Sequence, residues 1–151
     1  MDSKQWLKEL VEDELNPNAL TKDNGSTKAK YVVIFALPPW IILTDYLKTN
    51  NYDVVFPVQQ QIVTPTRHHQ HVPIHYVGLY TVGIWCIDKP GITGEKLRWK
   101  AWLELKRIFE ENPVYHAQPQ VIKAVRDKDA KYGETILYYT ELLISKVVDN
   151  I

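Results

Sequence analysis

Four histidines lie close together near the middle of the chain and offer the best ligand chemistry in the sequence. They are His68, His69, His71 and His75. Imidazole nitrogens bind zinc, copper and nickel well, and on an extended segment His69 and His71 point to the same side. Residues 54–87 contain no Asp or Glu to complete a ligand set, and the H-E-x-x-H pattern is absent. A small domain that binds a metal or another ligand through its histidines is therefore an alternative, while we expect no metal and no cofactor.

The same stretch predicts a polar connection between two strands. Residues 64–73 (TPTRHHQHVP) are rich in polar and turn-forming types, which is typical of a hairpin loop at the surface. Side chains at such a tip can reach a neighbouring molecule, and histidines there can respond to pH. The candidates for exposed loop contacts are Arg67, His68, His69 and His71.

Nucleophilic and phosphate chemistry find little support. Cys86 stands between Trp85 and Ile87 in an apolar run, where an inert, buried thiol is the usual outcome. No G-x-S-x-G elbow is present. Residues 90–94 (PGITG) have neither the P-loop lysine nor the dinucleotide spacing. We therefore expect no catalytic residues, and an intracellular enzyme of unknown class is the second alternative.

The composition is that of an ordinary globular domain. Of 151 residues, 45% are hydrophobic and 24% are charged, which predicts a single domain over residues 1–151. The lone cysteine excludes an internal disulfide framework. Lys and Arg together number 18, as do Asp and Glu, so a protein whose main task is sequence-specific nucleic-acid binding is not expected.

The sequence carries no sign of export or membrane insertion. It opens without the basic start and apolar stretch of a secretory signal. The longest uncharged stretch, residues 68–87, contains four histidines, a glutamine and a proline, which makes it a poor bilayer span. We expect a soluble protein that is cytoplasmic during synthesis and has no membrane partner.

The first half of the chain predicts one helix followed by strands. Apolar residues recur at helical spacing over Ser3–Leu15, and residues 16–30 are polar, with an Asn-Gly turn signal that predicts a mobile loop. The strand signals are Tyr31–Leu37, Asp53–Val63 and Ile74–Asp88.

Two positions in this half refine the prediction. Pro57 lies inside a strand signal and indicates an edge position or a bulge. Trp40–Lys48 fits either a short helix or a strand, and periodicity does not decide between them.

The second half predicts a long helix and a further hairpin. A helix over Gly94–Glu111 follows a turn, and Thr93 can cap it. Gln120–Arg126 and Glu134–Val148 read as strands, joined by a charged connection at residues 127–133. The fold class is therefore α+β: a mainly antiparallel sheet with a long hairpin, packed by two main helices, in the order helix, strand, short element, two strands, helix, two strands.

Self-association is indicated by two features. Residues 31–93 contain only three basic and three acidic side chains, so this segment has few charged groups with which to face the solvent. Trp99 and Leu103 lie one turn apart, off the main apolar stripe of the second long helix. A helix on one sheet needs only one stripe, so this pair is covered either by the N-terminal helix or by another copy of the chain.

The order of elements resembles that of the tail-completion or tail-terminator proteins of tailed phages and related proviruses. The matching features are the opening helix Trp6–Leu15, the hairpin through residues 53–88, the helix Leu97–Phe109 and the closing strand Glu141–Val148. The resemblance implies a non-enzymatic subunit of a homo-oligomeric ring, expected to be hexameric, at the head-proximal end of the tail tube. Its partners would be itself, tail-tube proteins and neck proteins, and its destination the virion. No functional residue is carried over from the family.

Overall fold

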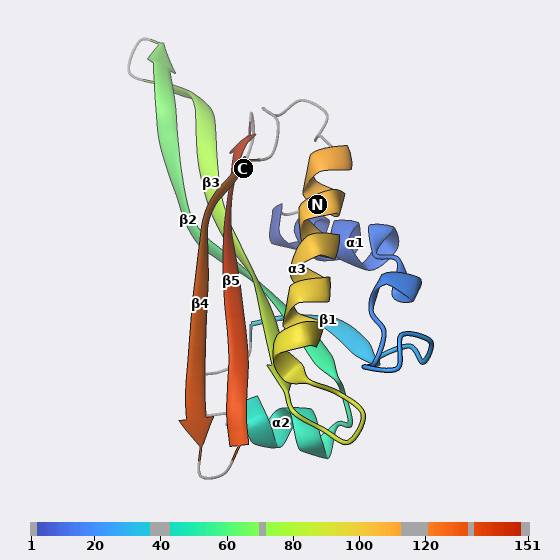
Figure 1. Cartoon of the computed structure of the whole chain (residues 1–151). Helices are drawn as coiled ribbons and strands as arrows, with labels where there is room; N and C mark the ends of the chain where they lie inside the picture. Colours follow the sequence, from blue (N-terminus) through green and yellow to red (C-terminus); the bar gives the residue numbers. More distant parts are fainter. Residues whose placement is uncertain (1–2, 37–42, 70–71, 113–120, 133–134, 149–151) are drawn as a thin grey trace.

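The computed structural model describes residues 3–36, 43–69, 72–112, 121–132 and 135–148, and it describes side chains at residues 5–36, 45–60, 78–112 and 135–144. Within these residues, three α-helices, a short 3-10 helix and five strands follow one another (Figure 1). They are α1 (Ser3–Glu14), η1 (Pro17–Ala19), β1 (Tyr31–Phe35), α2 (Leu43–Thr49), β2 (Val54–His69), β3 (Val72–Ile87), α3 (Gly94–Glu111), β4 (Val121–Tyr132) and β5 (Thr135–Val148).

The predicted α+β class and element order are confirmed. The five strands form one sheet in the order β1-β2-β3-β5-β4. The β2–β3, β3–β5 and β5–β4 pairs are antiparallel, and only β1 runs parallel to its neighbour β2. The β2–β3 hairpin extends beyond the other strands at one end of the sheet (Figure 1), because β5 pairs with β3 only as far as Tyr76.

The edge position predicted at Pro57 is wrong. Pro57 lies opposite Ile34 of β1 in a parallel register, while β3 runs along the other side of the same strand. The chain leaves β1, passes through α2 and returns with β2 beside β1, which makes this pair parallel. No local sequence pattern indicates such a pairing. A register shift does occur in β2, but after the proline, between Gln60 and Ile62.

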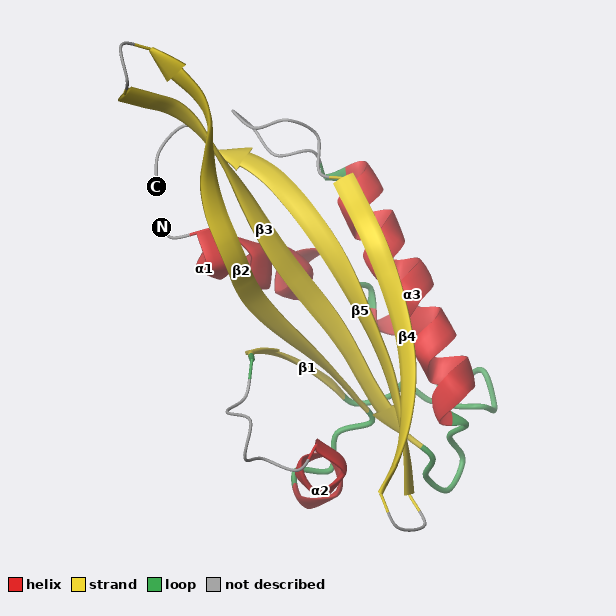
Figure 2. Cartoon of the chain, turned by 90° about the vertical axis from the view of Figure 1, so that its left-hand side faces the viewer, coloured by secondary structure: helices red, strands yellow, loops and turns green. Residues whose placement is uncertain are grey.

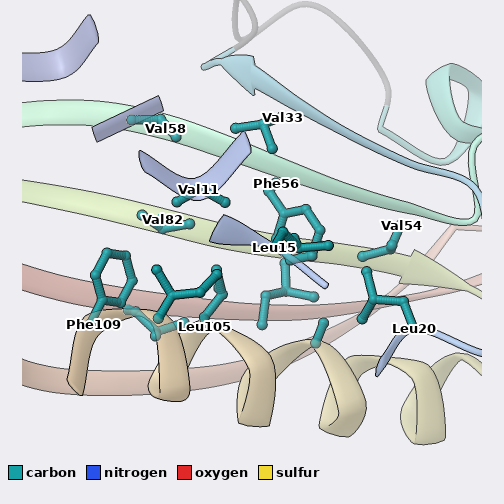
Figure 3. Close-up of a cluster of buried hydrophobic side chains, with 14 of the residues drawn as sticks. Val11, Leu15, Leu20, Val33, Val54, Phe56, Val58, Val82, Leu105 and Phe109 are labelled. Atoms are coloured by element: carbon teal, nitrogen blue, oxygen red, sulfur yellow. The ribbon is translucent and has the colours of Figure 1, made fainter. Parts of the chain in front are cut away.

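The helices divide unequally between the two faces of the sheet. α1 and α3 cover one face and build the main core with it (Figures 1 and 3). Alternate residues of each strand point to this core, including Phe56 from β2 and Tyr80 from β3, both fully buried. The short helix α2 covers part of the opposite face, where Leu47 packs on Trp85 and Leu137. The segment whose type the sequence left open is thus helical over Leu43–Thr49.

Two predicted connections are strand for most of their length. β2 continues to His69 and β3 begins at Val72, so the predicted loop at residues 64–73 is largely a two-stranded ribbon. The charged stretch predicted to join the last two strands also belongs to β4, which pairs with β5 as far as Tyr132 opposite Thr135. Strands can contain polar and charged residues and still pair through their backbones. The polar residue types therefore did not predict where these strands end.

The segment at residues 16–30 is tied to the rest of the molecule at several points. Leu20 and Ala29 are buried in the main core, and the two oxygens of Asp23 accept hydrogen bonds from the backbone N–H and the hydroxyl of Thr93 at 2.9 and 2.8 Å. The Lys100 ammonium donates to the carbonyl oxygen of Thr21 at 3.0 Å. The mobility expected of this loop stays a prediction, and these contacts oppose it.

Candidate functional site

The outer side of α3 carries the largest apolar side chains that the described part of the chain exposes. Trp99 is 59% exposed and Leu103 is 46% exposed. They lie four residues apart and therefore stand next to each other on the helix surface. We call this pair the outer ridge. The sequence predicted that both residues leave the main apolar stripe, and the structure places both at the surface.

The inner side of α3 explains why the outer ridge cannot turn inward. Leu97, Ala101, Leu105 and Ile108 recur at helical spacing and are buried against the sheet. Rotating the helix to cover Trp99 would expose this stripe and lose roughly 1.5–3 kcal/mol for each large side chain brought into water. The orientation of α3, and with it the exposure of the ridge, is thus set by the core.

An ion pair between Glu104 and the partly exposed Arg107 also holds α3 in place. Glu104 is 5% exposed, and its carboxylate accepts hydrogen bonds from the Arg107 guanidinium and, at 3.0 Å, from the backbone N–H of Asn16. Arg107 also donates to the Glu14 carbonyl at 2.8 Å and to Glu111 at 2.7 Å. Burial raises the pKa of Glu104, but these hydrogen bonds outweigh burial and lower it overall.

The same contacts decide one alternative left open by the sequence. Glu14 at the end of α1 and Asn16 just after it bond to α3 on the side that carries Glu104 and Arg107. The N-terminal helix leaves Trp99 and Leu103 exposed. Within the described residues, α1 is therefore not the neighbour that covers the outer ridge.

Charged side chains border the ridge. Lys96 and Glu95 precede it on the exposed surface of α3, and Lys106 follows it in an ion pair with Glu110 at 3.6 Å. An apolar centre bordered by polar residues is the usual pattern of an interface patch.

The sheet has a second surface on the side away from α1 and α3. Figure 2 looks onto this side, where α2 is the only described helix and lies at the lower end. Above α2, the positions of β2, β3 and β5 that alternate away from the main core are Gln59, Leu79, Thr81, Glu141 and Leu143, and the β4–β5 register sets Arg126 opposite Glu141 on the same side. We call this set the open face. Leu79 and Leu143 are half-buried, and Thr81 is buried. Glu141 accepts a hydrogen bond from the Tyr139 hydroxyl at 2.5 Å.

The sequence did not indicate the open face. Its signal was the alternation of β5, in which Leu142 and Ile144 enter the main core while Glu141 and Leu143 point the other way. The alternation predicts two faces of the sheet, but only the position of α2 shows which part of them no described helix covers.

The loop-contact candidates turn out to belong to the projecting hairpin. Arg67, His68 and His69 are residues of β2 rather than of a loop, and His71 lies outside the described residues. The backbone of Arg67 pairs with that of His75. Among the residues that the structure describes, no three His, Cys, Asp or Glu side chains come together as a metal site.

Cys86 behaves as the sequence predicted. Its thiol is fully buried in the main core, and burial raises the pKa of the thiol far above its usual range. A thiolate nucleophile is not formed in such a place.

The described helices contain no segment long and apolar enough to cross a bilayer. A comparison with protein-family models finds no match, and a comparison with curated proteins finds none either.

Proposed function

We propose that this chain is a non-enzymatic structural subunit of a viral or proviral tail or neck assembly, which forms a homo-oligomeric ring that caps or joins the tail tube. The observation that carries the proposal is the outer ridge. Trp99 and Leu103 are the two most exposed large apolar side chains on the described surface, and they lie together on one rigid helix.

Exposure of the apolar Trp99 and Leu103 side chains to water is unfavourable, which favours a protein partner that covers them. Aromatic anchors on rigid elements dominate binding energy at protein interfaces, and Trp99 is held on a helix that the core already orients. The confirmed order of elements, from the opening helix to the closing strand pair, supports the same family resemblance. The ring is expected to be hexameric, with tail-tube and neck proteins as its further partners.

Native mass spectrometry of the wild-type chain tests the proposal, with electron microscopy of the same sample to see closed rings. We expect one defined oligomer that is lost in the double variant Trp99→Lys/Leu103→Lys, whose circular dichroism stays that of the wild type. A matched control is Ile136→Lys, because Ile136 is 36% exposed and lies on β5 outside the ridge. A wild-type chain that stays monomeric at high concentration, with and without tail-tube protein, contradicts the proposal.

A further inference from the structure

The segment at residues 16–30 contains the one asparagine of the sequence that a glycine follows, Asn24 before Gly25. Asparagine is a chemically labile residue, and a following glycine makes it more so, because no side chain shields the glycine nitrogen from the asparagine amide. We propose that Asn24 is a site of spontaneous deamidation, that the contacts of this segment with Thr93 and Lys100 slow the reaction, and that its isoaspartyl product frees the segment from α3. This inference does not depend on the ring proposed above.

The reaction requires only the chain and water. The backbone nitrogen of Gly25 gives up its proton and bonds to Cγ of Asn24, the Cγ–Nδ2 bond breaks, and the amide nitrogen takes up the proton and leaves as ammonia. Water then opens the resulting imide ring on either side. Cleavage of the new bond to Cγ restores the normal backbone with an aspartate. Cleavage at the α-carbonyl carbon instead leaves an isoaspartate, in which the main chain runs through Cγ.

Hydrogen bonds hold both reacting groups in the folded chain. The Gly25 N–H donates to the carbonyl oxygen of Lys22 at 2.9 Å. Oδ1 of Asn24 accepts from the backbone N–H groups of Ser26 and Thr27, each at 2.9 Å, and Nδ2 donates to the Thr27 hydroxyl at 2.7 Å. Loss of the Gly25 proton breaks the first bond, and rotation of the amide towards Gly25 breaks the others. The reaction therefore depends on local opening of this turn.

Two side-chain contacts fasten the turn to α3 and its first residues. Asp23, next to the reacting asparagine, accepts hydrogen bonds from the backbone N–H and the hydroxyl of Thr93. The Lys100 ammonium donates to the carbonyl oxygens of Thr21 at 3.0 Å and Lys22 at 3.4 Å. The Lys22 carbonyl is the one that also accepts from the glycine N–H. Opening of the turn must break or strain these bonds, so they slow deamidation in the folded chain.

The two products affect the turn differently. An aspartate at position 24 keeps the normal backbone, and its oxygens still accept from the N–H groups of Ser26 and Thr27. An isoaspartate lengthens the main chain by one carbon atom just before Gly25, which moves the Gly25 N–H away from the Lys22 carbonyl. The turn that sets Asp23 beside Thr93 is then lost. The isoaspartyl chain should therefore release this segment from α3.

Rates of deamidation test the first half of the proposal. Mass spectrometry of the peptide that carries residue 24 measures the conversion of amide to acid, in the native chain and in urea. We expect the native rate to be at least about tenfold lower. Thr93→Val and Lys100→Met should each raise the native rate about fivefold, the effect of one lost hydrogen bond, and leave the rate in urea unchanged.

The variants are chosen to leave the reacting residues and the helix intact. The Thr93 hydroxyl makes no capping bond to α3, so Thr93→Val removes its bond to Asp23 without uncapping the helix. Lys106→Met is the matched control for Lys100→Met, because Lys106 pairs with Glu110 on the same helix and makes no printed contact with the turn. It should deamidate at the wild-type rate. Circular dichroism checks the fold of each variant.

The aged protein tests the second half. Ion-exchange chromatography separates the deamidated chain, and enzymatic methylation identifies its isoaspartate. Amide hydrogen exchange at residues 20–29 and at Thr93 should be faster in the isoaspartyl chain than in the fresh chain. Asn24→Asp, which has the new charge on a normal backbone, should exchange as the wild type does.

Each part of the proposal can fail separately. No conversion at residue 24 in urea overturns Asn24 as the site. Equal native rates in wild type, Thr93→Val and Lys100→Met overturn the restraint by α3. Unchanged hydrogen exchange in the isoaspartyl chain overturns the release of the segment.

Discussion

The ring of Pro57 in β2 lies against Gly83 of the neighbouring strand β3. A Cβ atom added at Gly83 would stand 2.7 Å from Cγ of Pro57, which is closer than carbon atoms approach in folded proteins. Gly83 is therefore required for space, because it lets a proline lie in the middle of a sheet, between β1 and β3.

Replacing this glycine should destabilise the protein. We expect Gly83→Ala to lower the free energy of unfolding by about 1–3 kcal/mol, because the new methyl group overpacks the proline ring. Urea denaturation followed by tryptophan fluorescence measures the loss. The double variant Pro57→Ala/Gly83→Ala removes the obstructing ring and should recover part of it. If Gly83→Ala lowers the free energy of unfolding equally in the wild-type chain and in the Pro57→Ala variant, the two residues do not interact.

The Glu104 carboxylate predicts a stability that depends on pH. The pKa of Glu104 in the folded chain is lowered from its ordinary value of 4.5. The ionised carboxylate therefore makes its full contribution to the free energy of unfolding above about pH 4.5. The contribution is lost as the pH falls through the lower, folded-state pKa. Glu104→Gln should cost about 1–3 kcal/mol at neutral pH, and the difference from wild type should shrink in acid. Thermal unfolding of both proteins from pH 7 to pH 3 gives the comparison, and a difference that stays constant over this range contradicts the argument.

The contacts of Asp23 predict how the segment at residues 16–30 moves. Asp23 accepts two hydrogen bonds from Thr93, and these bonds, the backbone one first, lower the pKa of its carboxyl group. Asp23→Ala should speed amide hydrogen exchange at Thr93 and across residues 20–29, as measured by mass spectrometry. Asn18→Ala, in the same segment but without such a contact to α3, is the control. Rapid exchange of the whole segment in the wild-type chain would instead support the mobile loop that the sequence predicts.

The burial of Cys86 predicts a thiol that reagents reach only after unfolding. The native chain should show no reaction with a maleimide over the time in which the same chain in urea is labelled to one equivalent. Mass spectrometry counts the labels. Labelling of the native monomer at the rate of a free thiol would place Cys86 outside the core.

The order of elements was predictable because it is written in short-range patterns. The apolar spacing of α1 and α3, the β-branched runs of β1 and β3, and the prolines and glycines between them each act over a few residues. Trp99 and Leu103 could be placed off the packed stripe of α3 for the same reason, whereas the choice between cover by the N-terminal helix and cover by another copy needed the structure.

The remaining features depend on contacts that local patterns do not contain. The missing N–H of Pro57 predicts an edge position or a bulge, but β1 pairs with β2 at this residue. The charged residues after Arg126 are typical of a turn, whereas the β4–β5 ladder continues through them. The open face could not be located before the positions of α1, α2 and α3 on the sheet were known.

The order of strands in the sheet bears on the order in which the chain folds. Each of the two long hairpins, β2–β3 and β4–β5, joins strands that are adjacent in sequence, and β1 reaches β2 across the α2 connection alone. The β3–β5 pair instead spans α3 and β4, and it joins residues as far apart in the chain as Tyr76 and Val148. Because that longest loop must close before the two hairpins meet, the β3–β5 pair should accordingly be the last part of the sheet to form.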